Sequence, residues 1–156
     1  MESVKYYRNS KSKTKDISLS IFLFLIGVTL TYLDNFVVGI LISIIALIII
    51  VRALLKLPSV TVNELGIVTK VNGIGLTKWD YIQGFEIKKL FNTTCIALII
   101  KDQDKYINSK NKIIQKLIKS NLSKVGSPVI IPSQEFNKDL NIVIKEFENF
   151  LKNHKK

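Results

Sequence analysis

Residues 17–55 read ISLSIFLFLIGVTLTYL, then DN, then FVVGILISIIALIIIVRALL. In both apolar runs nearly every residue is apolar or a small Ser, Thr or Gly, and only Arg52 near the end of the second run is charged. A helix needs roughly 20 apolar residues to cross the hydrocarbon core of a bilayer, with about 17 as the lower limit. The two runs therefore predict a transmembrane helical hairpin, with helices at about residues 17–33 and 36–55.

A re-entrant hairpin and a cleaved signal peptide are the two alternatives to a transmembrane hairpin. Because only Asp34 and Asn35 separate the runs, a short hairpin that enters and leaves the same side of a bilayer stays open as an alternative. A cleaved signal peptide is disfavoured, because sixteen residues precede the first run and a second apolar run follows almost at once. We therefore expect the first helix to remain in the mature protein.

Lysine and arginine residues flank the hairpin at its two outer ends, whereas the turn between the runs has none. Positive residues next to short spans are retained on the cytoplasmic side, so the sequence predicts that both termini are cytoplasmic. Residues 1–16 would form a basic leader held against anionic headgroups. The residues concerned are Lys5, Arg8, Lys11, Lys13 and Lys15 before the hairpin, and Arg52 and Lys56 after it.

The whole chain of 156 residues carries a formal net charge of +11. A strongly basic chain raises the question of nucleic acid, but this sequence has neither an RNP-like aromatic strand motif nor a recognisable helix-turn-helix. An anionic membrane surface fits a hairpin-anchored chain better, and an overall bias toward Ile, Asn and Lys accounts for part of the charge. Cys95 is the only cysteine, so no disulfide forms within the chain, and its apolar neighbours predict a packing role.

After Pro58 the pattern changes from continuous apolar runs to alternation of apolar and polar residues. Short strands separated by turn residues, with no helix between them, predict an antiparallel meander that curls into a sheet or partial barrel. The expected strands begin at Val60 and continue at residues 67–71, 76–82, 85–90 and 95–100. The expected turns are Glu64–Gly66, Asn72–Gly73 and Asp102–Asp104, and Trp79 lies in the third strand.

Two amphipathic helices are expected after the meander. The first spans about residues 109–122, with a lysine-rich face and an apolar face of Ile113, Ile114, Leu117, Ile118 and Leu122. A short strand at residues 129–131 precedes Ser133, a candidate N-cap for a last helix that runs to about Asn153. The apolar stripe of that helix is wide enough to cap the open end of a curled sheet. The predicted fold class is thus α+β, with a hairpin at residues 17–55 and a domain at residues 58–156 that carries a basic helical insert near residues 105–126.

Four short motifs occur in order along the chain: YRNSKSK at residues 7–13, ELGI at 64–67, KWDYI at 78–82 and GSPVII at 126–131. With the two apolar runs, this order resembles an uncharacterised bacterial family of small two-helix membrane proteins with a cytosolic pleckstrin-homology-like domain. The resemblance implies that fold and a location in the bacterial inner (cytoplasmic) membrane, but no activity. Eukaryotic pleckstrin-homology domains bind phosphoinositides through clustered basic residues in their first hairpin, whereas the corresponding residues here, 68–73, include only Lys70.

The basic insert, residues 105–126, is the candidate binding surface, because it has several lysines and no acidic residue. An amphipathic basic helix can lie on an anionic membrane. The alternative is a solvated lysine face on a helix whose apolar side packs on the sheet. The candidate anionic-lipid contacts are Lys110, Lys112, Lys116, Lys119 and Lys124.

No catalytic, cofactor-binding or metal-binding constellation can be assembled from the sequence. Trp79 and Asp80 are expected to be structural, and His154 lies near the C-terminus with no second ligand or carboxylate near it in sequence. The apolar runs offer no ionisable residue for transport before Arg52. Gly27 and Gly39 permit close packing of the two helices or of neighbouring copies, so a homo-oligomer stays open.

These observations predict a membrane-anchored, non-catalytic binding module at the cytoplasmic face that engages an unidentified protein partner or anionic lipid headgroups. A membrane-resident immunity or inhibitor protein is the alternative, because small size, absent catalytic residues and helices without a transport path suit that role. No cofactor is expected, and nucleic acid is not the expected partner.

Overall fold

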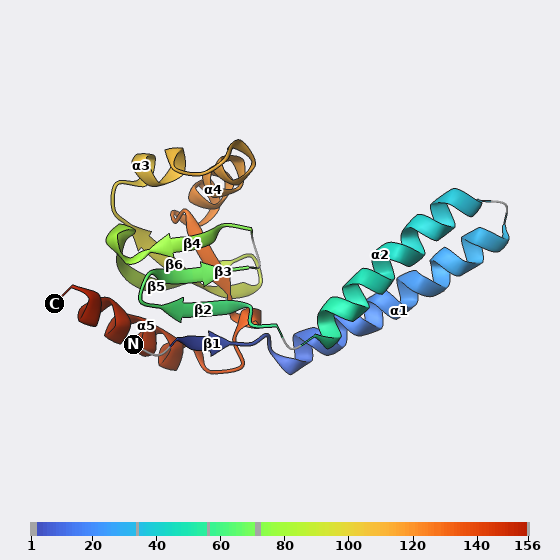
Figure 1. Cartoon of the computed structure of the whole chain (residues 1–156), viewed down its shortest axis with the longest axis horizontal. Coiled ribbons are helices and arrows are strands. Elements are labelled where there is room, and N and C mark those ends of the chain that lie inside the picture. The colour runs from blue at the N-terminus through green and yellow to red at the C-terminus, as the bar shows by residue number, and fades with distance from the viewer. Residues whose placement is uncertain (1–2, 34, 56, 71–72, 156) are drawn as a thin grey trace. The chain divides into compact units, whose positions relative to one another are not determined.

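The computed structural model describes residues 3–33, 35–55, 57–70 and 73–155 (Figure 1). The chain divides into a helical unit, Arg8–Leu57, and an α+β unit composed of Met1–Tyr7 and Pro58–Lys156. The helical unit is thus inserted into the α+β unit, between its first and second strands. Asp34 and Asn72, which the sequence places in turns, lie outside the described residues, as does Lys56, which it places next to the hairpin.

The helical unit consists of two long apolar helices, α1 (Ser10–Tyr32) and α2 (Phe36–Leu54), as the sequence predicts. α1 begins earlier than the expected start near Ile17, because the Asn9 side chain caps it by accepting a hydrogen bond from the Lys11 backbone N–H at 2.9 Å. The second half of the predicted leader, residues 10–16, is therefore helical and continuous with the apolar run.

Small residues form the contact between α1 and α2. The buried residues of these helices are Ser20, Gly27, Gly39 and Ala46, whereas most of the large apolar side chains are exposed. A Cβ atom on Gly27 would lie 2.9 Å from the Gly39 carbonyl oxygen, and one on Gly39 would lie 2.6 Å from the Gly27 carbonyl oxygen. Only glycine permits this approach, so both glycines serve packing within the hairpin.

The first sheet of the α+β unit is antiparallel and has the strand order β1-β2-β3-β4. Its strands are β1 (Val4–Tyr6), β2 (Val60–Asn63), β3 (Gly66–Thr69) and β4 (Gly75–Lys78). Gly66 sits in the β2–β3 turn with a φ of +150°, and a Cβ atom there would lie 2.1 Å from the Thr77 carbonyl oxygen. The sequence predicts that turn but not β1, which comes from the part of the leader that precedes α1.

The second sheet is also antiparallel, with the order β5-β6-β7. It consists of β5 (Ile82–Leu90), β6 (Thr93–Ile100) and β7 (Val129–Pro132). A short 3-10 helix, η1 (Trp79–Tyr81), connects the sheets, so Trp79 lies between strands and not within the third one. The strands therefore form two antiparallel sheets and not a closed barrel, which makes the fold α+β as predicted.

Three α-helices complete the α+β unit: α3 (Gln103–Asn108), α4 (Lys112–Val125) and α5 (Leu140–His154). The expected turn at Asp102–Asp104 instead leads into α3, and the predicted helix at 109–122 corresponds to α4. Ser133 does not cap the last helix. It begins the 3-10 helix η2 (Ser133–Glu135), and Asp139 caps α5 through a 2.8 Å hydrogen bond from the Asn141 backbone N–H.

Side chains of both sheets and of α3, α4 and α5 form the main core, in which aromatic rings pack among aliphatic residues. Phe147 of α5 packs edge-to-face on Tyr6, Phe85 and Phe136. A smaller cluster of Cys95, Ala97, Val125 and Ile130 lies between the second sheet and α4. α4 and α5 thus cover different parts of the sheets (Figure 1).

Candidate binding surface

The chain leaves the α+β unit and returns to it at neighbouring positions. Tyr6 pairs with Val60 at the end of β1, and the Ser59 backbone N–H donates to the Tyr6 carbonyl oxygen at 2.9 Å. The Ser59 hydroxyl also donates to the Glu135 carbonyl oxygen at 2.7 Å. One row of paired residues crosses all four strands at this end of the first sheet. It consists of Tyr6, Val60, Thr69 and Gly75, and we call this end of the sheet the junction end.

Tyr6 anchors the junction end in the core. Its side chain is fully buried, and its ring packs edge-to-face on Phe136 at 5.5 Å and on Phe147 at 5.6 Å. The Tyr6 hydroxyl donates to Glu146, whose other carboxylate oxygen accepts from Lys138 at 2.7 Å. Burial, together with the hydrogen bond to Glu146 and its charge, raises the pKa of Tyr6 far above its usual range, so the phenol remains a donor.

The pKa of Glu146 is lowered in the folded protein. Burial opposes this by disfavouring the charged carboxylate, but hydrogen bonds from Lys138 and Tyr6 and the positive charge of Lys138 outweigh burial. Tyr6, Lys138 and Glu146 therefore tie β1 to α5 through a charge-assisted contact that favours the ionised carboxylate.

Lys110, one of the predicted lipid contacts, is engaged within the fold. Its Nζ donates to the carbonyl oxygens of Ile74 at 3.2 Å and Leu76 at 2.8 Å, and it lies 5.0 Å from the centroid of the Tyr106 ring. Burial lowers the pKa of Lys110. The amine thus covers the free edge of β4 and joins the α3–α4 connection to the junction end.

α4 uses its apolar face inside the α+β unit. Asn111 caps it by accepting a 2.9 Å hydrogen bond from the Ile114 backbone N–H, and Ile118, Asn121 and Val125 are buried. Because this face is already packed, α4 cannot lie on a membrane through it without leaving the sheet. The predicted contact with anionic lipid therefore depends on the lysine-rich face of α4, and it stays a prediction.

The other predicted lysines of α4 point to solvent. Among the residues that the structure describes, none of Lys112, Lys116, Lys119 and Lys124 forms an ion pair, and all four are exposed. Ile113 lies among them with an 80% exposed side chain. The sequence predicts that both Ile113 and Ile114 belong to the buried face. Ile114 packs against the core as predicted, but Ile113 does not. Adjacent isoleucines leave helical periodicity ambiguous, so only the tertiary packing distinguishes them.

The remaining residues singled out in the sequence have structural partners. Cys95 is buried as expected, and burial raises its thiol pKa despite the nearby charge of Lys88. Trp79 is 2% exposed, donates from Nε1 to the Asn63 carbonyl oxygen at 2.9 Å and stacks on Phe150. The His154 Nε2 lies 3.3 Å from an Asp80 carboxylate oxygen, a pair that sequence distance conceals.

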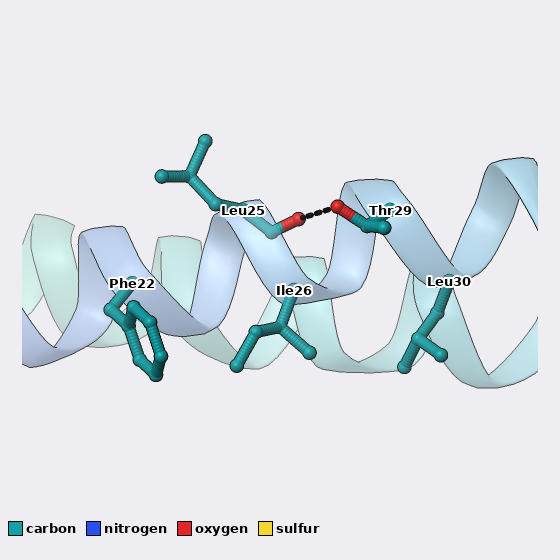
Figure 2. A pocket seen from close by; sticks show the side chains of 5 residues that line it. All are labelled: Phe22, Leu25, Ile26, Thr29 and Leu30. Atoms are coloured by element: carbon teal, nitrogen blue, oxygen red, sulfur yellow. Dashed lines mark hydrogen bonds between the residues drawn. The ribbon is translucent and has the colours of Figure 1, made fainter.

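Other candidate sites offer less chemistry. Within the described ranges, no group of three or more His, Cys, Asp or Glu residues is arranged to hold a metal ion. A hollow on α1 is lined by Phe22, Leu25, Ile26, Thr29 and Leu30 (Figure 2). The Thr29 hydroxyl donates to the Leu25 carbonyl oxygen at 2.9 Å, so the lining offers a ligand mainly apolar contacts.

Comparison of the chain with protein-family models, with curated proteins and with solved structures gave no match. The geometry of the two units is therefore the basis for the function proposed below.

Proposed function

We propose that the chain is a membrane-anchored, non-catalytic binding module, in which α1 and α2 span a membrane and the α+β unit is held at its cytoplasmic face. The pairing of β1 with β2 carries this proposal. Because Tyr6 and Ser59 are hydrogen-bonded neighbours, both ends of the inserted helices start from one place on one folded unit. An inserted segment of two helices that crosses a bilayer twice meets that constraint, whereas a single crossing does not.

The side chains of the hairpin suit a lipid environment. By length and composition both helices are able to cross a membrane. The hydroxyl groups of Ser20, Thr29, Thr31 and Ser43 each donate to the carbonyl oxygen four residues earlier, so they present no unsatisfied donor to hydrocarbon. Large exposed apolar side chains along both helices, which water would penalise, become favourable in lipid.

The architecture of the α+β unit supports a pleckstrin-homology-like fold. The sheets have four and three antiparallel strands, and the C-terminal helix α5 packs on the core between them. The first strand pair of this unit is β1–β2, so the connection between those strands is the helical unit itself. Residues 68–73, which the resemblance assigns to the first hairpin, instead include the end of β3 and precede β4.

The ligand class proposed for this module is anionic lipid at the bacterial inner membrane. The four exposed lysines of α4, which form no ion pair among the described residues, support it, because lysines near an anionic leaflet are attracted to it. Lysines at the start of α1 and Arg52 at the end of α2 support the cytoplasmic orientation.

Alkaline extraction of membranes tests the anchoring. Full-length protein should stay in the membrane fraction at high pH, because an inserted hairpin resists conditions that release peripheral proteins. The matched variant joins residues 3–7 to residues 58–155 through a short Gly-Ser linker and should be soluble and folded. Release of the full-length chain by alkaline extraction would contradict the proposal.

A further inference from the structure

The N-terminal turn of α4 lies at the junction end of the first sheet. A Cβ atom on Gly73, beside β4, would lie 3.5 Å from Cδ1 of Ile114, and Lys110 holds the carbonyl oxygens of Ile74 and Leu76. These contacts bring the start of α4 to the end of the sheet at which the chain passes into and out of the helical unit. The C-terminal end of α4 instead lies near β5, where Lys88 donates to the Val125 carbonyl oxygen.

The exposed surface at that turn is apolar at one position and basic around it. Ile113 is 80% exposed, although the isoleucine that follows it packs on the core. Lys112 precedes it, and Lys116 is one helical turn further along the same side. Lys70, exposed at the end of β3, is held at the junction end by its backbone N–H, which donates to the Ser59 carbonyl oxygen at 3.1 Å.

Charge complementarity identifies the occupant of this surface. No acidic residue occurs between Asp104 and Glu135 in the chain, so the charged side chains of α4 itself are all positive. An apolar side chain among lysines is the combination that enters the interface of an anionic bilayer, because the aliphatic group is buried while the amines remain with the phosphates. A single isoleucine is too small an anchor for a stable protein interface, whereas a tethered domain needs only weak contacts.

We propose that the first turn of α4, together with the end of β3, binds the surface of anionic phospholipids directly, with Ile113 entering the headgroup interface. The lysines that contact the lipid phosphates are Lys70, Lys112 and Lys116. This inference rests on the proposed function, because the chain enters and leaves the proposed membrane-spanning helices next to the junction end. The proposed lipid contacts do not include Lys110, because its amine already donates to the carbonyl oxygens of Ile74 and Leu76.

A fluorescent probe at position 113 tests this inference in the full-length protein. Ile113→Cys carries an environment-sensitive label after reconstitution into vesicles of phosphatidylcholine alone, or of equal parts phosphatidylcholine and phosphatidylglycerol. Cys95 stays in place, since it is 1% exposed and its thiol pKa is raised, so it reacts poorly. Leu65→Cys is the matched control, because Leu65 is 65% exposed in the β2–β3 turn, at the opposite end of the first sheet.

The probe at position 113 should shift to shorter wavelength in the anionic vesicles but not in phosphatidylcholine, while the probe at position 65 is unchanged in both. The double substitution of Lys112→Gln and Lys116→Gln should lower the equilibrium constant for lipid contact at position 113. The expected decrease is roughly five-fold for each lysine removed. Lys145→Gln with Lys152→Gln removes the same charge from α5 and should have little effect.

Vesicle flotation separates the two possible failures. If the chain floats with vesicles but the probe at position 113 behaves like that at position 65, the lipid contact is wrong while the anchor stands. A shift that is equal in neutral and anionic vesicles, or unaffected by loss of Lys112 and Lys116, also overturns it. If the chain does not float, the proposed function itself fails.

Discussion

Tyr6 shows how much of the fold depends on one residue that lies outside the main body of the α+β unit in sequence. Helices α1 and α2 separate it from β2, yet it is fully buried against Phe136 and Phe147. Replacing a buried aromatic residue of this size with alanine lowers the free energy of unfolding by about 3–5 kcal/mol. Native domains are stable by only about 5–15 kcal/mol, so this side chain alone accounts for a large share of stability.

Tyr6→Phe should lower the free energy of unfolding by about 1–2 kcal/mol, because the ring packing remains but the hydroxyl bond to Glu146 is lost. Denaturant unfolding of the linked variant without the hairpin, followed by Trp79 fluorescence, measures this change. Tyr7→Phe is the control, since in the described part of the chain the Tyr7 hydroxyl has no hydrogen bond. Equal effects of the two substitutions would show that the Glu146 contact is unimportant.

Glu146 should make stability depend on pH. Its pKa is lower in the folded state than in the unfolded chain, where it is about 4.3. The ionised carboxylate therefore stabilises the fold above that pH, and the contribution is lost as the pH falls through the lower folded pKa. Glu146→Gln should lower the denaturation midpoint at neutral pH, and the difference from the unmodified chain should shrink in acid. A difference that is constant with pH would contradict this account.

At the scale of elements, the contact between α1 and α2 depends on two glycines, each four residues before a hydroxyl residue, in the patterns Gly27-xxx-Thr31 and Gly39-xxx-Ser43. The Thr31 and Ser43 hydroxyl groups donate hydrogen bonds to the carbonyl oxygens of Gly27 and Gly39. These side chains therefore stay close to their own helix and allow the other helix to approach. The sequence predicts that these glycines permit close packing of the two helices or of neighbouring copies, and the structure shows the contact between the two helices of one chain.

Gly27→Ala and Gly39→Ala should each destabilise the hairpin by about 1–3 kcal/mol, because the added methyl group overlaps backbone of the neighbouring helix. Thermal unfolding of the full-length chain in detergent, followed by helical circular dichroism, measures the effect. Gly84→Ala is the control, since its Cβ atom would meet Ile99 at an ordinary distance of 3.5 Å. An unchanged midpoint in both helix variants would show that α1 and α2 are further apart.

Local patterns predicted the elements whose signals are local. The alternation after Pro58 and the turn at Glu64–Gly66 indicate β2 to β6, and the apolar runs indicate α1 and α2. The sequence does not predict β1, because its three residues are too few to show a periodic pattern. Its partner strand, β2, also lies beyond the hairpin in the sequence. The exposed position of Ile113 and the bound state of Lys110 depend on packing between distant elements, which no window of sequence contains.

At the scale of the whole molecule, the insertion of the helical unit makes the α+β unit a split domain. Residues 58–155 alone lack β1, which leaves the edge of β2 unpaired and opens the core around Phe136 and Phe147. β1 and residues 58–155 are nevertheless close in space, because the Ser59 backbone N–H donates to the Tyr6 carbonyl oxygen.

A chain of residues 58–155 should therefore be largely unfolded or aggregated, whereas residues 3–7 linked to 58–155 should fold. The buried Tyr6 and the restored β1–β2 ladder supply the difference. Dispersed amide signals in the NMR spectrum of the linked chain, and their absence from the shorter one, are the expected readout. A shorter chain that is equally stable would mean that β1 is dispensable.

Cysteine labelling with a membrane-impermeant reagent tests most directly the claim that a membrane-spanning hairpin interrupts one folded domain. Tyr32→Cys lies at the end of α1 near the turn, and Leu65→Cys lies in the β2–β3 turn of the α+β unit, where both native side chains are exposed. We expect the reagent to label position 32 in intact cells, and to label position 65 only after permeabilisation. Labelling of both positions from the same side of the membrane would contradict it.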